Sequence, residues 1–507
     1  MKTKARDVLL AISSGALTAL AFPKFGLSFL AWVSLLPLLF LLLKRTPRQS
    51  FWLGLTAGFI FYAILLYWIP SVPAHYGGLS PWLSLLVYLI LVLFLALFWG
   101  LFGFLSTRLH RRFPRLGYLL LPLVWISLEY ILTYILTGFP WGLLGTTQYK
   151  NLPYIQLASL TGVYGLSFIL VLFQSAFVYS FASRKRSPFF VVLGLVLFLH
   201  LGGWLSIRKI APTSDSFTAS VLQGNVSSDI YWDQVSPEEV RRLFEQHMEL
   251  SEQAFQSGAR LIIWPEFSVT LCFSCPQEIY QYFKDRLTAF VQTRKATLLL
   301  GTNETTGPPR DLKYRNTALC LAPDLSITQY YKMHLVPFGE YTPYKKIFFF
   351  IEKVTHAIGD ITPGTDHILH QFEDNKFGSP ICYEVIFPDL VRKFAKKGAS
   401  FLVTITNDGW YGKTSAPYQH FSMAVLRAVE NRRFLLRAAT TGISGIVDPY
   451  GRILSQSELL TRTFLTGQIT PSQELSFYTR FGDLLPLVGL TLTVISFILA
   501  LVKRNHG

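Results

Sequence analysis

Ser379-Pro380-Ile381-Cys382-Tyr383-Glu384 is the stretch around which the second half of the chain is organised, because it places a cysteine between a strand and a helix. Residues 376–381 have the pattern of a strand, and Pro388 is a favourable first residue for a helix over 389–397. Such a turn exposes the sulfur, and its backbone N–H groups can bind the oxyanion that forms when the sulfur attacks a carbonyl. Cys382 is therefore the candidate nucleophile, although most buried cysteines are packing residues.

Two other stretches carry an ionisable side chain at the end of a predicted strand. Leu261-Ile262-Ile263-Trp264-Pro265-Glu266 is an apolar strand that ends in a carboxylate, and Tyr330-Tyr331-Lys332 places a lysine where a strand gives way to a long loop. Glu, Lys and Cys in this order resemble the nitrilase, or carbon–nitrogen hydrolase, superfamily over residues 216–475. The resemblance includes Thr406-Asn407-Asp408-Gly409-Trp410-Tyr411, Ala428-Val429-Glu430-Asn431-Arg432 and Asp448-Pro449-Tyr450-Gly451.

The chemistry of such a site gives each of these three residues an expected role. A thiol reacts as its thiolate and is mostly protonated near neutral pH, so Cys382 needs a base. Glu266, withdrawn from water at the end of its strand, is expected to take that proton. Lys332 is expected to hold a positive charge beside the oxyanion, with the Tyr383 N–H as a second donor.

Other residues are candidates for supporting roles. Glu340 and Glu384 could orient the lysine or a substrate amine, and for Glu384 a structural salt bridge is an equal alternative. Trp232, Trp410 and Tyr383 could wall a lipid pocket, whereas packing in a core is the default for any single aromatic residue.

The composition indicates a chain that is partly dissolved in lipid. Of its 507 residues, 51% are hydrophobic and only 15% are charged. Most of its uncharged apolar runs approach the roughly 20 residues that are needed to cross a bilayer. These runs span residues 8–22, 27–43, 51–69, 82–105, 116–136, 157–182, 189–207 and 484–502. We therefore predict a polytopic α-helical bundle with eight transmembrane helices.

The distribution of Lys and Arg predicts the orientation of this bundle, because these residues are enriched in cytoplasmic loops. The three short outside loops contain only Lys24 and Lys150. The predicted inside segments contain Lys2, Lys4, Arg6, Lys44, Arg45, Arg48, Arg108, Arg111, Arg112, Arg115, Arg184, Lys185, Arg186, Lys503 and Arg504. Topology thus accounts for most of the net charge of +16, and nucleic-acid binding is not indicated.

Three domains follow from this topology. Residues 1–207 form a seven-span bundle, residues 208–483 an extracytoplasmic domain, and residues 484–507 the eighth helix and a cytoplasmic tail. In the extracytoplasmic domain, strands are predicted at 218–225, 260–264, 296–302, 316–321, 327–331, 377–381, 400–406, 445–448 and 463–469, and helices at 237–256, 276–293, 389–397 and 419–438. This alternation predicts an α/β sandwich with a largely buried sheet, which the αββα fold of the nitrilase superfamily fits.

A nitrilase-like domain between the last two of eight spans is similar to the apolipoprotein N-acyltransferase family. The motifs Phe139-Pro140-Trp141, Trp264-Pro265-Glu266 and Cys382-Tyr383-Glu384 carry this closer resemblance. It implies a bacterial inner-membrane enzyme without a cofactor, with its catalytic domain on the periplasmic side. An acyl chain of phosphatidylethanolamine would form a thioester with Cys382, and the N-terminal amine of an apolipoprotein's diacylglyceryl-cysteine would attack it. Two sequential acceptors make this scheme ping-pong.

Two alternatives remain open. A membrane-anchored amidohydrolase would pass the acyl group to water, which attacks the same thioester. A transporter or receptor could carry a non-catalytic nitrilase-like domain, but the intact triad and the scarcity of charge within the membrane argue against it. Glu129 is the exception among the apolar runs, and we expect it to be neutral or hydrogen-bonded inside the bundle.

Two features outside the triad carry their own expectations. Cys272 and Cys275 could form a small loop disulfide in an oxidising compartment, and Cys320 is expected in a core. Residues 344–351 place three phenylalanines behind two lysines, which suits either a lid on the outer face of the bilayer or a strip packed on the domain.

Overall fold

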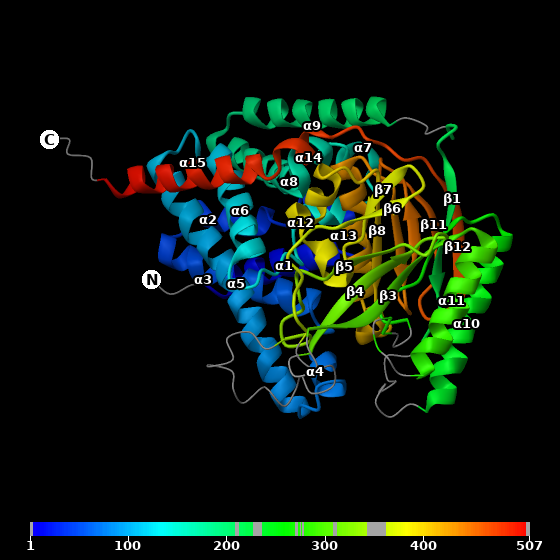
Figure 1. Ribbon diagram of the computed structural model, residues 1–507. Helices are drawn as coiled ribbons and strands as arrows, with labels where there is room; N and C mark the ends of the chain where they lie inside the picture. Colours follow the sequence, from blue (N-terminus) through cyan, green and yellow to red (C-terminus); the bar gives the residue numbers. More distant parts are fainter. Residues whose placement is uncertain are drawn as a thin grey trace. The chain divides into compact units, whose positions relative to one another are not determined.

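The computed structural model describes residues 4–207, 212–226, 236–268, 272–273, 275, 278–307, 312–341 and 361–502 (Figure 1). The chain divides into two compact units. The first comprises Met1–Pro70, Ser80–Ile207 and Phe481–Gly507, and the second comprises Ser71–Leu79 and Arg208–Arg480. The short segment Ser71–Leu79 therefore belongs to the second unit, although it connects two helices of the first.

The first unit is built from helices. Its α-helices are α1 (Ala5–Leu20), α2 (Leu36–Leu42), α3 (Pro47–Leu65), α5 (Pro81–Arg112), α6 (Gly117–Tyr134), α7 (Leu152–Ile155), α8 (Ala158–Ser183), α9 (Ser187–Ser206) and α15 (Leu484–Leu501). In the described part of the chain, five of them are long and apolar enough to cross a membrane: α5, α6, α8, α9 and α15. The eight predicted crossings are thus supported for five of the apolar runs.

The second predicted crossing shows why the count differs. Residues 27–43 form a 3-10 turn, Ser28–Trp32, followed by the seven-residue helix α2. Pro37 lies in the first turn of α2, where its missing N–H costs nothing, so a new helix begins there instead of one continuous span.

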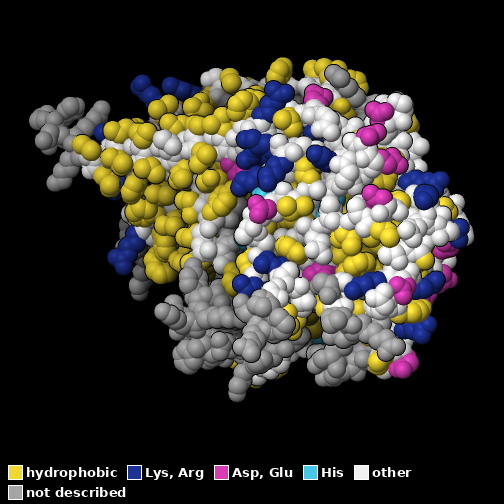
Figure 2. Space-filling model, in the orientation of Figure 1, with side chains coloured by type: hydrophobic (Ala, Val, Ile, Leu, Met, Phe, Trp, Pro, Cys, Tyr) yellow, Lys and Arg dark blue, Asp and Glu magenta, His cyan; other side chains and the backbone are white. Residues whose placement is uncertain are grey.

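The surface of this unit suits lipid better than water. Within α15 only Pro486, Gly489 and Thr493 are buried, so its leucines, valines and isoleucines are largely exposed. Figure 2 shows hydrophobic side chains gathered over this helix. Inside the bundle, Glu129 accepts hydrogen bonds from Trp125 Nε1 at 2.9 Å and from the Leu144 N–H at 2.8 Å, which confirms the expected hydrogen-bonded carboxyl group.

The second unit contains two six-stranded sheets. The first has the order β12-β1-β2-β3-β4-β5 and the second the order β11-β10-β9-β8-β7-β6. The strands of the first are β1 (Phe217–Gln223), β2 (Leu261–Ile263), β3 (Thr297–Thr306), β4 (Lys313–Leu321), β5 (Ile327–Tyr331) and β12 (Thr463–Ile469). Those of the second are β6 (Leu369–Phe372), β7 (Asn375–Gly378), β8 (Phe401–Thr406), β9 (Leu435–Ala439), β10 (Gly445–Val447) and β11 (Ile453–Gln456). Among the named strands of the described residues, β1-β2-β3 and β7-β8-β9 pair in parallel and the other neighbours pair antiparallel.

Helices cover the outer faces of both sheets, which confirms the predicted αββα sandwich (Figure 1). The helices α10 (Pro237–Gln256) and α11 (Glu278–Arg294) bury Phe244 and Phe283 against Ile262 of the first sheet. The helices α12 (Pro388–Lys396) and α13 (Ala416–Asn431) pack on β7, β8 and β9. Between the sheets, the ring of Phe217 lies 4.6 Å from Phe372 and 5.1 Å from Phe401, centroid to centroid.

One predicted helix is wrong in its last seven residues. The helix predicted over 419–438 ends at Asn431, the chain turns at Arg432 with φ 52°, and β9 begins at Leu435. Every residue of β9 is buried, so the strand lacks the alternation that would distinguish it from a buried helix. As a result Arg437 lies on a strand of the sheet.

Candidate active site

The carboxylate and the ammonium predicted at the ends of β2 and β5 meet inside the second unit. Lys332 Nζ lies 3.3 Å from Glu266 Oε1 and 2.9 Å from Glu340 Oε1. All three side chains are buried, with no more than 5% of any residue exposed. We call Glu266, Lys332 and Glu340 the carboxylate–lysine cluster. Burial opposes the charge on Lys332, but the two carboxylates outweigh it and raise the pKa of the lysine, which therefore stays protonated.

A residue that the sequence did not single out joins the two carboxylates. Asn316, on β4, donates from Nδ2 to Glu266 Oε1 at 2.7 Å and to Glu340 Oε1 at 2.9 Å. Backbone donors hold the other carboxylate oxygens: the Asn407 N–H binds Glu266 Oε2 and the Val336 N–H binds Glu340 Oε2, both at 2.8 Å. Both carboxylates are thus fixed in position before any substrate arrives.

Cys382 begins the short 3-10 turn Cys382–Ile386 and is only 5% exposed. Its φ of 51° lies in the left-handed region, which residues with a Cβ seldom adopt. Burial and the Glu266 carboxylate raise the pKa of the thiol, while Lys332 and a hydrogen bond with Thr406 act in the opposite direction. Because the pKa is raised overall, Cys382 rests as a thiol and requires a base. Both Glu266 and Lys332 thus act electrostatically on the Cys382 thiol, and the catalytic triad of the three residues stays a prediction.

Glu384 connects the Cys382 turn to the loop after Lys332. Its Oε2 accepts the Ile381 N–H at 2.7 Å, and its Oε1 accepts the N–H groups of Met333 at 2.7 Å and His334 at 3.0 Å. The Tyr330 hydroxyl adds a fourth hydrogen bond at 2.8 Å. Among the residues the structure describes, Glu384 forms no salt bridge, so the ion pair considered for it is wrong. Four hydrogen bonds hold its carboxylate instead.

The three aromatic candidates have different surroundings. The Tyr383 ring is buried and packs against His334 and Phe387, with centroids 5.7 Å and 5.2 Å away. The Trp410 ring lies 4.7 Å from that of Tyr76, which belongs to the segment Ser71–Leu79 of the same unit. Trp232 and the suggested lid at 344–351 lie outside the described residues.

Comparison with known proteins places this site in a family. The N-terminal domain of apolipoprotein N-acyltransferases matches residues 14–176, and the carbon-nitrogen hydrolase family matches residues 218–475. An apolipoprotein N-acyltransferase of Geobacter metallireducens is 40% identical over 492 residues, covering 94% of this chain and 92% of the relative. That of Pseudomonas putida is 32% identical over 486 residues, covering 93% and 92%. The chain belongs to the apolipoprotein N-acyltransferase family.

This membership confirms the predicted family and makes the chain a membrane enzyme of the carbon–nitrogen hydrolase and N-acyltransferase type. Among solved structures, an amidase of the nitrilase superfamily from Nesterenkonia is 20% identical, with a TM-score of 0.39, and covers 54% of this chain and 96% of its own.

A second buried group of ionisable residues in this N-acyltransferase-family chain lies behind Cys382. Asp408 Oδ2 lies 2.9 Å from Arg437 Nη2, and Asp408 Oδ1 lies 2.9 Å from His420 Nδ1. Nε2 of His420 lies 3.2 Å from the carbonyl oxygen of Cys382. We call Asp408, His420 and Arg437 the aspartate–histidine–arginine cluster; all three side chains are fully buried.

The charges of this cluster balance. Burial acts to raise the pKa of Asp408, but the Arg437 guanidinium outweighs it and lowers the pKa to about 2. Burial and the same guanidinium lower the pKa of His420. The sequence did not predict this cluster, because Arg437 was assigned to a helix. The position of Asp408 just after β8 could have indicated a functional residue, since Glu266 and Lys332 also follow strands.

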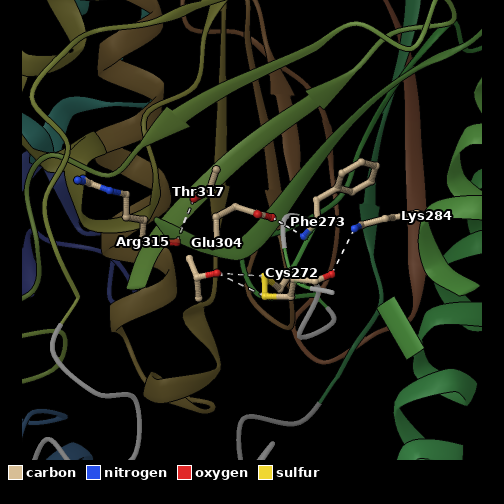
Figure 3. Close-up of a disulfide and its surroundings, with 8 residues drawn as sticks. Cys272, Phe273, Lys284, Glu304, Arg315 and Thr317 are labelled. Atoms are coloured by element: carbon tan, nitrogen blue, oxygen red, sulfur yellow. Dashed lines mark hydrogen bonds between the residues drawn. A yellow bond between two sulfur atoms is a disulfide. The ribbon is translucent and has the colours of Figure 1, made fainter. Parts of the chain in front are cut away.

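The disulfide left open by the sequence is present between Cys272 and Cys275, in the segment that follows Glu266 (Figure 3). The Phe273 N–H donates to Glu304 Oε1 at 2.8 Å, and Lys284 Nζ donates to the Cys275 carbonyl at 3.3 Å. Both contacts attach the disulfide loop to the first sheet and α11. Cys320 is buried in β4, as predicted.

Proposed function

We propose that this chain transfers an acyl chain from a phospholipid, phosphatidylethanolamine in the simplest case, to the N-terminal amine of the diacylglyceryl-cysteine of apolipoproteins. The names of its full-length relatives support this acceptor. The observation that carries the proposal is the carboxylate–lysine cluster, in which a buried ammonium lies between two carboxylates and both Glu266 and Lys332 act electrostatically on the Cys382 thiol. This set supplies a base, a nucleophile and a positive charge in one site that excludes water.

The first half-reaction makes a thioester. Glu266 takes the Cys382 proton, and the thiolate attacks the ester carbonyl of the phospholipid. Lys332 and the Tyr383 N–H stabilise the oxyanion. When this intermediate collapses, the ester C–O bond breaks, the leaving alkoxide takes the proton from Glu266, and a lysophospholipid departs.

The second half-reaction makes an amide. The amine of the apolipoprotein attacks the thioester carbonyl, and Glu266 takes a proton from the amine nitrogen. The C–S bond then breaks, the proton returns to the sulfur, and the free thiol is restored. The lysophospholipid leaves before the amine binds, so the mechanism is ping-pong.

The supporting residues act through these groups. Glu340 holds Lys332 and Asn316 in place, and Glu384 fixes the turn that carries Cys382. Tyr383, Trp410 and Trp232 are proposed as walls of the lipid pocket, with Trp232 lying outside the described residues.

We also propose the arrangement in the membrane. Residues 1–207 contribute seven crossings and 484–507 the eighth, and residues 208–483 lie on the periplasmic side of the bacterial inner membrane. Five apolar helices of sufficient length support the crossings. The Cys272–Cys275 disulfide supports an extracytoplasmic site, because disulfides persist in oxidising compartments.

Intact-protein mass spectrometry tests the proposed function. The detergent-solubilised chain is incubated with phosphatidylethanolamine, alongside Cys382→Ala. We expect a mass gain of one acyl group that the variant lacks and that a diacylated lipopeptide discharges. Discharge by buffer at the same rate would instead indicate a hydrolase, and no adduct would indicate a non-catalytic domain.

A further inference from the structure

The backbone carbonyl of Cys382 is held by a side chain of the helix α13. His420 Nε2, from α13, lies 3.2 Å from this oxygen. A carbonyl oxygen only accepts hydrogen bonds, so Nε2 carries the hydrogen in this contact. One residue earlier, the Ile381 N–H donates to Glu384 Oε2 at 2.7 Å, which holds the chain as it enters the turn. The left-handed residue Cys382 thus lies between two hydrogen-bonded backbone groups, the Ile381 N–H and its own carbonyl.

The remaining contacts of His420 keep the hydrogen on Nε2. Arg437 Nη2, which only donates, lies 2.9 Å from Nδ1 and meets its lone pair in the neutral ring. Asp408 Oδ1 lies 2.9 Å from the same nitrogen and would accept a proton placed there. Thr406 donates to this carboxylate oxygen at 3.1 Å. In both the neutral ring and the protonated ring, Nε2 therefore donates to Cys382.

The contact with His420 also determines the direction of the N–H group in the Cys382–Tyr383 peptide. The C=O and N–H of a trans peptide point in opposite directions. When the Cys382 carbonyl points toward α13, the Tyr383 N–H of the same peptide points away from α13. That N–H is the backbone donor proposed above for the oxyanion. A flip of this peptide would replace the donor by a carbonyl oxygen, which repels an oxyanion.

We propose that His420 is a positioning residue that orients the Cys382–Tyr383 peptide as an oxyanion donor, with Asp408 and Arg437 fixing its ring. This inference rests on the proposed thioester chemistry. It assigns a function to the aspartate–histidine–arginine cluster, none of whose members is proposed to touch substrate.

Two substitutions of His420 distinguish the effect of losing the Nε2 hydrogen-bond donor from the effect of losing the imidazole ring. The side-chain nitrogen of glutamine can take the place of Nε2, whereas asparagine is shorter and takes the place of Nδ1. We expect His420→Asn to lower the single-turnover rate of Cys382 acylation by phosphatidylethanolamine about 100-fold, the effect of losing one oxyanion donor. We expect His420→Gln to retain most of the wild-type rate.

Alkylation of Cys382 by iodoacetamide is the second readout, because this displacement forms no oxyanion. We expect both variants to be alkylated at the wild-type rate; an unfolded variant would expose Cys382 and react faster. Acylation of His420→Asn at the wild-type rate overturns the inference. Equal losses in the Gln and Asn variants, or a parallel loss of alkylation, also overturn it. A wild-type chain that gains no acyl group overturns the proposed function and this inference together.

Discussion

Two buried ionic clusters lie around Cys382, and they differ in charge balance. Lys332 faces two carboxylates in one, whereas Arg437 faces a single carboxylate in the other. A buried charge is costly unless it is paired. The carboxylate–lysine cluster has one carboxylate more than its single ammonium can pair, and this carboxylate is available to act as a base. The aspartate–histidine–arginine cluster has no excess charge and its histidine contacts the backbone. Burial alone therefore does not identify a base; the uncompensated charge does.

Removal of Lys332 is expected to have the largest effect. Lys332→Met leaves the buried carboxylates of Glu266 and Glu340 facing each other without a cation. We expect acyl transfer to fall by about 1,000-fold, at the upper end for the loss of an oxyanion partner. We expect the free energy of unfolding to fall by about 3–5 kcal/mol, the range for breaking a buried ion pair. Initial rates and thermal unfolding in detergent measure both.

A second substitution separates the two effects of this change. Glu340→Gln in the Lys332→Met background should restore stability but not activity. Lys393→Met is the matched control: its ammonium lies 2.8 Å from Asp389 Oδ2 and is 49% exposed, so we expect a change in stability of at most about 1 kcal/mol. Activity of Lys332→Met close to that of Lys393→Met would remove Lys332 from the mechanism.

Asn316 tests whether the carboxylate–lysine cluster depends on a neutral residue. Asn316→Leu removes two hydrogen bonds, to Glu266 and to Glu340, without changing the charge. We expect kcat to fall about 100-fold because the base is no longer positioned, comparable to the lower range for general-base catalysis. KM for phospholipid should stay unchanged, since Asn316 is not proposed to contact lipid. A rise in KM with kcat intact would contradict this role.

The two clusters also differ in how far the sequence predicted them. The meeting of Glu266 and Lys332 was predictable because each follows a strand within a recognisable motif. Asn316 was not, because its partners come from segments distant in the chain and nothing in its own strand marks it. Arg437 was hidden because a fully buried strand lacks alternation, so the periodicity of α13 seemed to continue through it.

Helices and strands were likewise predictable where their sequence pattern is distinctive. The helix α10 has the predicted bounds, and the Ser236 side chain caps its first turn by accepting the Glu239 N–H. Its apolar side chains lie on one face, in the core beside the first sheet, which is the pattern that makes a helix predictable. The N-terminal membrane runs were less predictable, because apolar composition alone does not show where Pro37 starts a new helix.

Acid should act on the aspartate–histidine–arginine cluster through Asp408. Its pKa is lowered from 3.8 to about 2, so its stabilising effect is present above about pH 4 and is lost as the pH falls toward 2. The shift corresponds to about 2 kcal/mol. Thermal unfolding between pH 5 and pH 2 measures this slope, and Asp408→Asn should flatten it in that window. An unchanged slope in the variant would mean that other carboxylates cause the acid sensitivity.

Removal of the Cys272–Cys275 disulfide is expected to have the smallest effect. It tests whether the carboxylate–lysine cluster depends on a covalent bond in the neighbouring loop. The loop it closes is short, since the cysteines are three positions apart, so the entropy model gives at most about 2 kcal/mol of stabilisation. Glu266 is held by Asn316, Lys332 and the Asn407 N–H, none of which belongs to the disulfide loop. We therefore expect Cys272→Ser/Cys275→Ser to lower the melting temperature slightly and to leave initial rates of acyl transfer unchanged. Dithiothreitol should lower the melting temperature of the wild type and of Cys320→Ala, but not that of the double variant. A loss of activity with little loss of stability would show that the loop itself shapes the site, and the hydrogen bonds around Glu266 would then be insufficient to hold the base.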